Sequence, residues 1–292
     1  MPDFCVSSKK KGKKTMRKPK DFEDLTFADD YMFCRILQKH MSAAKQIVKL
    51  ATGREVERVE YSSKQCVVDS YANAKSIRFD IYFVGDNEVY DIKMQTTKQK
   101  DIVKRTRYYL GMSDVEMLKQ GEAYGKLPRS FIIFICKFDP FGMGYLKYAC
   151  EERLFGVGKQ TVDITQEAKF SAEYQKVFLN AGKLIADAEN SELANFLNFV
   201  YSGEAKDEFT HELAKYVQET KQSAEEAHRY MTYQEHLRDS YNEGMADGVK
   251  KASLSFVKTL LEKGFSDEEI IELSKISPDE LQKLKEELSK QG

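Results

Sequence analysis

The chain has 292 residues, 41% of them hydrophobic and 32% charged, and its formal net charge is −1. Its 18 Phe and 16 Tyr side chains can build a buried core, which excludes a wholly disordered chain. The longest apolar run, Phe131 to Cys136, has six residues, whereas a membrane-spanning helix needs about 20. We therefore expect a folded protein without a membrane partner.

Cysteine usage and the first residues bear on the compartment. The five cysteines are an odd number and none forms a CxxC pair, which argues against a disulfide framework and against a zinc finger. No apolar segment follows the early lysines, so we expect no secretory signal. These features favour a reduced, cytoplasmic location.

Positive charge is concentrated at the start of the sequence. Residues 1–20 carry eight Lys or Arg and one acid, a charge of +7, which leaves the remainder near −8. We expect a disordered basic arm over 1–20. Such an arm either tracks nucleic-acid phosphates or simply keeps the protein in solution.

The first predicted helix begins after this arm. Thr26 and Asp29 have the spacing of a capping box. Apolar residues then recur with the helical period from Phe33 to Leu50, and Gly53 is a typical C-terminal stop. The spacing predicts one helix over this range.

Strand patterns follow the helix. Residues 56–61 give a weak strand signal, while 76–84 and 89–95 read as stronger strands separated by the turn signal Gly85-Asp86-Asn87-Glu88. These two segments predict an antiparallel hairpin. A helix is expected over 98–120 and a buried strand over 130–137.

After about residue 166 the pattern predicts helices and loops, including helices over 191–201 and 204–232. Glycines 244 and 248 each follow an acid, and they predict a hinge or a close helix-packing seam because glycine is costly in a helix. Two short amphipathic helices are expected over 252–288. Their spacing resembles a helix–turn–helix, but the second is rich in acids, which favours protein contact such as self-association over entry into DNA.

The expected turn fixes which residues face each other across the hairpin. A turn at 86–87 pairs Tyr82 with Asp91 and Asp80 with Lys93. One face of an otherwise apolar hairpin then carries the polar side chains of Asp80, Asp91, Lys93 and Gln95. Polar groups on a covered sheet are costly unless paired. The stripe therefore indicates a functional site or, alternatively, a salt bridge on a half-exposed hairpin.

Seven segments form an ordered set of motifs: Leu25–Phe33, Arg78-Phe79-Asp80, Tyr90–Gln95, Arg105–Tyr109, Phe131–Phe141, Val177–Gly182 and the glycine pairs at 243–248. In this order they resemble a PD-(D/E)XK nuclease family whose members are described as transposases or recombination-promoting nucleases (Rpn). The first hairpin strand resembles the family's R-L-D motif, and the second resembles a strand that reads I-E-M-Q. The resemblance spans about residues 22–290.

The resemblance implies an α/β fold: a restriction-endonuclease-like core, with a mixed sheet flanked by helices, and a helical C-terminal half. It also implies a metal-dependent DNA endonuclease in which two carboxylates hold Mg²⁺ or Mn²⁺. Carried onto this sequence, Asp80 is the first metal ligand and Gln95 positions the water. Asp30 is the candidate for the acid on the first helix.

Lys93 departs from the family pattern, which has Glu at this position, and three interpretations stay open. The site is silent and the ammonium stands in for the metal. Alternatively, Asp91 replaces the missing acid as a metal ligand, so that Asp91-Ile92-Lys93 is itself a D-x-K triplet. In the third, Lys93 is an inactivating change in an otherwise active lineage. The function is thus a metal-dependent DNA endonuclease or, alternatively, an inactive DNA-binding or protein-interaction module.

Basic residues follow the hairpin on the predicted helix. Lys100, Lys104 and Arg107 have the spacing of one helix face, with Arg105 beside them. This face either contacts DNA phosphates or is an ordinary solvated surface.

The expected organisation has four parts: the basic arm (1–20), the nuclease-like core (21–165), a helical extension (166–242) and a Gly-hinged helical tail (243–292). Self-association is expected through the C-terminal helices.

Overall fold

The structure is a computed structural model that describes residues 20–63, 67–68, 77–78, 80–168, 173–182 and 191–289. Apart from Lys20, the predicted basic arm lies outside these residues. The chain divides into two compact units, one ending at Glu226 and the other beginning at Ala227. No helix in the described ranges combines the length and the apolar character needed to cross a bilayer.

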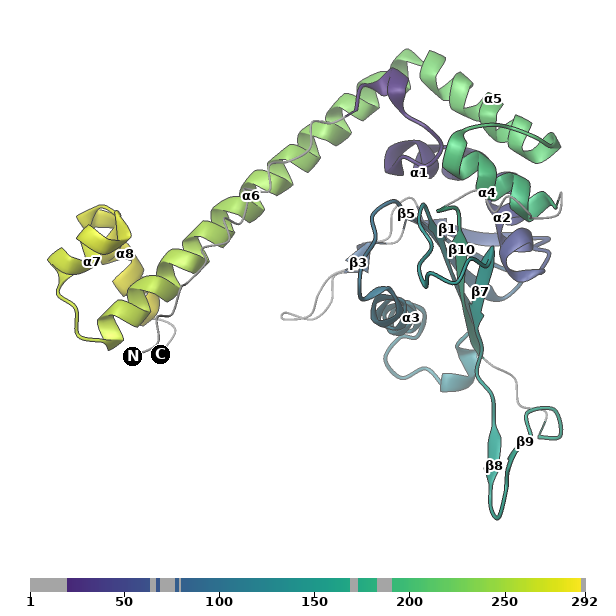
Figure 1. The fold of residues 1–292 in the computed structure, drawn as a ribbon, viewed down its shortest axis with the longest axis horizontal. Coiled ribbons are helices and arrows are strands. Elements are labelled where there is room, and N and C mark those ends of the chain that lie inside the picture. The colour runs from purple at the N-terminus through teal and green to yellow at the C-terminus, as the bar shows by residue number, and fades with distance from the viewer. Residues whose placement is uncertain are drawn as a thin grey trace, which may run out of the picture. The chain divides into compact units, whose positions relative to one another are not determined.

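A six-stranded mixed sheet forms the centre of the first unit (Figure 1). In spatial order its strands are β1 (Val59–Ser63), β4 (Ile81–Gly85), β5 (Glu88–Gln95), β6 (Arg129–Cys136), β10 (Tyr174–Asn180) and β7 (Lys147–Cys150). The three strands β5, β6 and β10 are parallel, and the other neighbours pair antiparallel. Two small ribbons pair β2 (Val67–Val68) with β3 (Ile77–Arg78) and β8 (Phe155–Val157) with β9 (Thr161–Asp163).

Helices cover both faces of this sheet. They are α1 (Asp30–Lys39), α2 (Met41–Thr52), α3 (Ile102–Met117), α4 (Glu192–Ser202) and α5 (Glu208–Gln222), with short 3₁₀ turns at Phe22–Asp24 and Tyr124–Lys126. In Figure 1, α3 lies along one side of the sheet, and α2 and α4 lie on the other. Because β6 is central and covered twice, seven of its eight residues are buried. The expected α/β fold with a mixed, helix-flanked sheet is confirmed.

The single helix expected from Thr26 to Leu50 is two helices. His40 interrupts it with φ −120° and ψ 77°, and its ring stacks on Tyr216 of α5 with centroids 3.5 Å apart. The helix begins at Asp30, while the Asp29 carboxylate accepts the backbone N–H of Thr26 at 2.8 Å. Tertiary packing thus overrides a sequence period that continues through the break.

The region after residue 166 was expected to be helical, but Tyr174–Asn180 forms β10 inside the sheet. The last four residues of this strand are buried on both faces. A short strand of this kind shows no polar–apolar alternation, which is the signal that identifies strands in a sequence. The helix expected over 191–201 is confirmed as α4, and the helix expected over 204–232 ends at Gln222 before α6 begins.

The second unit consists of helices. The 39-residue helix α6 (Ala224–Glu262) is followed by α7 (Asp267–Ser274) and α8 (Pro278–Ser289). Ser266 and Glu269 form a capping box at the start of α7. The end of α6 packs on the two short helices through a cluster of apolar side chains: Val257, Leu260, Ile270, Leu281 and Leu284.

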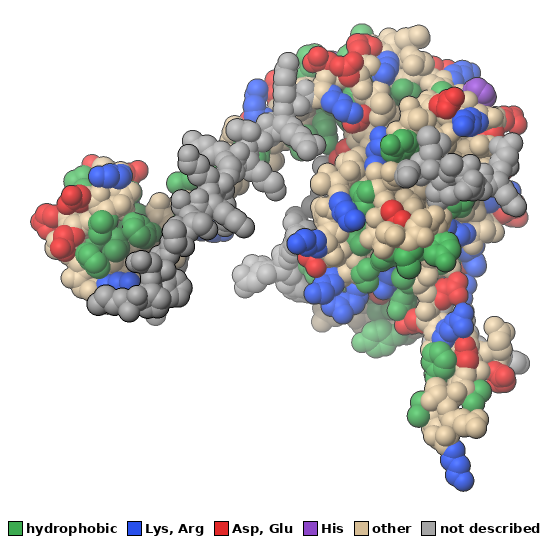
Figure 2. All heavy atoms as spheres, viewed as in Figure 1, with side chains coloured by type: hydrophobic (Ala, Val, Ile, Leu, Met, Phe, Trp, Pro, Cys, Tyr) green, Lys and Arg blue, Asp and Glu red, His purple; other side chains and the backbone are tan. Residues whose placement is uncertain are grey.

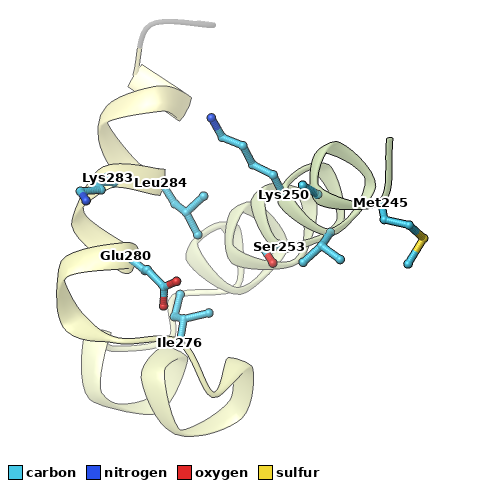
Figure 3. A pocket seen from close by; sticks show the side chains of 9 residues that line it. Met245, Lys250, Ser253, Ile276, Glu280, Lys283 and Leu284 are labelled. Atoms are coloured by element: carbon cyan, nitrogen blue, oxygen red, sulfur yellow. The ribbon is translucent and has the colours of Figure 1, made fainter. Parts of the chain in front are cut away.

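The two glycines of α6 form neither a break nor a packing seam in the described structure. The helix runs through Gly244 and Gly248, and a Cβ atom added at either position would have no neighbour within 4 Å. A groove of about 550 Å³ opens nearby between α6 and α8 (Figure 3). Its lining includes Met245 and Val249 of α6 and Ile276 and Leu284.

A buried acid fastens the first turn of α6 to α1. Glu226 is 1% exposed, and it accepts hydrogen bonds from Arg35 at 2.6 and 2.8 Å and from the Tyr31 hydroxyl at 3.0 Å. Lys39 forms an ion pair with it at 2.7 Å. The hydrogen bonds from Arg35 lower the pKa of Glu226 to about 2, outweighing the effect of burial.

We predict that Glu226→Gln lowers the free energy of unfolding at pH 7 by about 2 kcal/mol, because charge-assisted bonds from Arg35 and Lys39 are lost. The folded-state pKa of Glu226 lies below its ordinary value of 4.5. Its stabilisation is therefore complete above that value and disappears as the pH falls toward 2. Urea unfolding at several pH values measures both effects. The exposed Glu235→Gln on the same helix is the control; an equal loss in both variants would contradict the prediction.

Candidate active site

A tight turn sets the register of the β4–β5 hairpin. Asp86 and Asn87 have φ values of 50° and 59°, as a type I′ turn requires. The Asp86 carboxylate accepts the backbone N–H groups of Glu57 at 2.7 Å and Arg58 at 3.1 Å. Tyr82 pairs with Asp91 across the strands, so the expected register is confirmed.

This register brings three charged side chains together on the face that α3 covers. Asp91 and Lys93 lie two residues apart on β5, and Asp80 directly precedes β4. The Lys93 Nζ atom is 3.6 Å from Asp80 Oδ1 and 3.9 Å from Asp91 Oδ1. The side chains of Asp91, Lys93 and Asp80 are 1%, 4% and 16% exposed. A one-residue slip of the hairpin would turn these groups to the opposite face.

Asp91 is the most deeply buried of the three. Neither of its carboxylate oxygens has a hydrogen-bond partner in the described structure. Burial raises the pKa of Asp91 from 3.8 to about 7, although the charge of Lys93 works against this rise. Burying a carboxylate without hydrogen bonds lowers the free energy of unfolding. A group that is kept in spite of this cost indicates a functional site.

Lys93 remains an ammonium in this setting. Burial lowers its pKa, but the nearby charges of Asp91 and Asp80 outweigh burial and hold the pKa above its ordinary value. Its Nζ atom also lies 4.6 Å from the centroid of the Tyr109 ring, a favourable cation–π distance. The sequence indicated Tyr109 only as the last residue of the Arg105–Tyr109 segment.

Gln95 follows on the same face of β5, but both ends of its amide are engaged. Its Nε2 donates to the carbonyl of Thr97 at 2.8 Å, and its Oε1 accepts from Arg105 at 3.0 Å. The Arg105 guanidinium is half-buried, donates also to Gln99 and lies 5.7 Å from the centroid of the Tyr109 ring. Arg105 therefore supports the site from inside, unlike the exposed basic residues beside it.

Helix α1 lies beside the charged cluster. The Cys34 thiol, a contact that the sequence did not reveal, approaches the carbonyl of Asp80 at 3.9 Å. Asp30 lies one helical turn before Cys34 and is exposed at the start of α1. Among the described residues, no group of three or more His, Cys, Asp and Glu side chains is suited to hold a metal ion, and the role of Asp30 stays a prediction.

The predicted basic face lies on α3. Lys100 before the helix and Lys104 and Arg107 within it are all exposed. Figure 2 shows Lys and Arg side chains gathered on the surface in the region of α3. These residues are positioned at the surface of the same helix that covers the charged cluster.

The donor set fits a divalent cation in part. Asp80 and Asp91 supply two carboxylates, and the Asp91 oxygens, which accept no hydrogen bond in the described structure, are hard ligands of the kind that Mg²⁺ prefers. Lys93 forms ion pairs with both carboxylates and supplies one positive charge of its own. Asp80 and Asp91 are therefore the residues that would hold a cation.

Comparison with known families agrees with this architecture. The model of the PD-(D/E)XK nuclease family transposase matches residues 30–254, and the chain belongs to this family. PD-(D/E)XK nucleases generally depend on divalent metals. Neither the comparison with curated proteins nor the comparison with solved structures gives a significant match.

We predict that Asp91 makes the fold less stable as the pH rises. Its folded pKa is about 7 against an ordinary 3.8, so its contribution is complete below 3.8 and disappears as the pH passes 7. From pH 5 to pH 8, the unfolding free energy should fall relative to Asp91→Asn by at most roughly 3 kcal/mol. Asp101→Asn, an exposed neighbour, should keep the wild-type slope. Parallel slopes for wild type and Asp91→Asn would refute the assignment.

Proposed function

We propose that the protein is a metal-dependent DNA endonuclease whose catalytic set is Asp80, Asp91 and Lys93. The observation that carries this proposal is the buried Asp91 carboxylate, which has no hydrogen-bond partner in the described structure and lies 3.9 Å from Lys93. In this arrangement Asp91-Ile92-Lys93 is the D-x-K triplet. It lies two residues earlier on the strand than the Glu-x-Gln pair of the family pattern.

The contacts of Gln95 favour the shifted triplet. Its amide is held at both ends by Thr97 and Arg105, so we assign Gln95 to fixing Arg105. Lys93 lies between the two carboxylates. The water-positioning role therefore passes from Gln95 to Lys93.

The side chains have distinct tasks in this proposal. Asp80 and Asp91 would hold Mg²⁺ or Mn²⁺, which when bound polarises the phosphodiester and lowers the pKa of the attacking water. Lys93, whose Nζ lies within 4 Å of both carboxylates, acts as a hydrogen-bond donor that orients the nucleophile and stabilises developing negative charge. The ring face of Tyr109, whose centroid lies 4.6 Å from Nζ, keeps the ammonium next to the two carboxylates.

DNA is the proposed partner, and exposed basic residues next to the cluster support this assignment. Lys100, Lys104 and Arg107 lie at the surface of α3 or directly before it, where phosphate contacts would position the strand without reading its sequence. The basic residues within 1–20 would add sequence-independent affinity.

The alternative function is an inactive DNA-binding or protein-interaction module. It is favoured by the ion pairs themselves, since an ammonium within 4 Å of both carboxylates already supplies a positive charge to them. In that case Lys93 replaces the cation permanently and the fold serves binding alone.

Plasmid nicking in Mg²⁺ or Mn²⁺ separates the two functions. We expect the wild type to nick supercoiled DNA, and Asp80→Ala and Asp91→Asn to lose at least about a hundredfold in rate, because each removes a proposed ligand. Glu116→Gln, an exposed acid on α3, should retain the wild-type rate and is the matched control.

The same assay identifies the alternative. An inert wild type together with an active Lys93→Glu would show a site silenced by the lysine. If no variant cleaves while the wild type still binds DNA, the protein is a binding module.

We also propose that two copies of the protein associate through antiparallel α6 helices. Residues 235–247 carry four acids and one Arg, a charge of −3, whereas residues 250–261 carry three Lys and no acid. Antiparallel pairing sets the acidic segment of one copy against the basic segment of the other. Met245 and Val249, which are 52% and 62% exposed, would then be covered by the partner helix next to Gly244 and Gly248.

Charge exchange tests this association. The double variant Lys250→Glu/Lys251→Glu should raise the dimer dissociation constant by about tenfold, since several complementary pairs become repulsive. Adding Asp239→Lys and Glu243→Lys to this double variant should restore the dimer dissociation constant of the wild type. Light scattering coupled to size exclusion measures the mass over a concentration series. A monomeric wild type, or no rescue by the compensating changes, would refute the antiparallel pairing.

A further inference from the structure

The turn that follows β6 is held rigid by one aspartate. The Asp139 carboxylate accepts the backbone N–H groups of Phe141 at 3.0 Å and of Gly142 and Gly144 at 2.7 Å. It also accepts the hydroxyl of Tyr148 at 2.8 Å. Four hydrogen bonds to one side chain fix the conformation of residues 139–146.

The chain around this turn is tied to the end of β10. The carbonyl of Tyr145 accepts the side-chain amide of Asn180 at 3.0 Å. A Cβ atom on Gly182 would lie 2.3 Å from the backbone of Phe138, so only glycine allows this close approach. The turn is therefore anchored at both of its ends.

Large apolar side chains nevertheless face solvent on this turn. Phe141, Met143 and Tyr145 are 37%, 62% and 63% exposed. Phe141 packs edge-on against Phe178 and Tyr148, with centroids 5.2 and 4.8 Å apart. Exposed aromatic groups on a rigid turn lose little conformational entropy when a flat ligand stacks on them.

The turn and the charged cluster lie at the same edge of the sheet. The strands β5, β6 and β10 are parallel, so Gln95, the turn after Cys136 and Gly182 all lie at their carboxyl ends. They also share a face, because Lys93 pairs with Phe134, and Phe134 pairs with Phe178.

Ring contacts connect the two places across the sheet. Tyr109, which holds Lys93, lies 6.2 Å from Phe134, and Phe134 lies 6.0 Å from Phe178. At about 4.8 Å per strand, β5 and β10 are about 10 Å apart. A nucleic-acid strand spans this distance with about three nucleotides at roughly 3.4 Å each.

Basic side chains border the same region. Ile102 in the first turn of α3 is buried with Phe134 and Phe178, and Phe138 and Tyr148 pack against this cluster. The exposed residues Lys100 and Lys104 flank Ile102. The helix that covers this part of the sheet thus carries positive charge on its exposed surface, and the lysine before it adds to this charge.

We propose that the 139–146 turn is a stacking platform for unpaired nucleotides next to the phosphate at the Asp80–Asp91–Lys93 site. The proposal rests on the DNA function proposed above and deepens it by naming the substrate form. Paired bases are stacked on each other inside a duplex, whereas unpaired bases can lie on Tyr145 and Met143. Stacking of this kind tolerates any base, so the platform selects DNA structure, such as single strands, bubbles and flaps, rather than sequence.

Binding measured by fluorescence anisotropy, with Ca²⁺ in place of Mg²⁺, tests the platform. The probes are a labelled single strand, the matched duplex and the same duplex with an internal bubble. The wild type should bind the single strand and the bubble several-fold tighter than the duplex. Met143→Ala/Tyr145→Ala should weaken binding to these two forms by about tenfold or more and change duplex binding by less than about twofold.

Tyr124→Ala is the matched control. Tyr124 is 83% exposed and precedes the amino end of β6, at the opposite edge of the sheet. This variant should bind all three probes as the wild type does. Thermal unfolding of both variants should match the wild type, because the altered side chains are exposed.

Three outcomes would overturn the platform. If the double variant keeps the wild-type preference for unpaired DNA, the turn does not stack bases, and the DNA function stands. If the double variant loses self-association while DNA binding is unchanged, the turn is a contact between copies. If the wild type binds none of the probes, the proposed DNA function fails together with the platform.

Discussion

The structure depends on burying two carboxylates and one ammonium beneath a single helix. Asp91 and Lys93 are 1% and 4% exposed, and Asp80, which directly precedes β4, is the third member of the cluster. Taking charges out of water costs several kcal/mol for each ion unless they are paired. The three charged groups therefore have to be held close to one another. The fixed hairpin register, which the Asp86–Asn87 turn sets, does this. The neighbouring Tyr109 ring and the Gln95–Arg105 contact hold the surrounding side chains.

The two acids of the cluster have unequal surroundings. Asp80 is partly open, whereas Asp91 is sealed and its pKa is raised to about 7 by burial. The ionised form of a carboxylate that is destabilised by burial in the unliganded protein is stabilised most when a cation binds beside it. In the proposed function, the same lysine that departs from the family pattern completes a catalytic set that begins two residues earlier on the strand. Family membership gives the fold and a nuclease-type function, and the side-chain contacts support this particular assignment of roles.

Much of the site could be predicted from the sequence, because a strand period of two and a two-residue turn fix a hairpin register. The pairing of Tyr82 with Asp91 follows from these rules and is confirmed. The support from Tyr109 and Cys34 could not be predicted, since it depends on where α3 and α1 lie against the sheet. The break at His40 and the strand at 174–180 were missed for a similar reason. Stacking on Tyr216 and burial on both faces are tertiary effects that leave no local period.

A crystal structure of the protein soaked with Mn²⁺, with anomalous scattering recorded, tests the central claim most directly. The account predicts one anomalous peak next to the carboxylates of Asp80 and Asp91, with the Lys93 ammonium no longer paired to both acids. An empty anomalous map, with Lys93 still paired to both acids at saturating Mn²⁺, would contradict it.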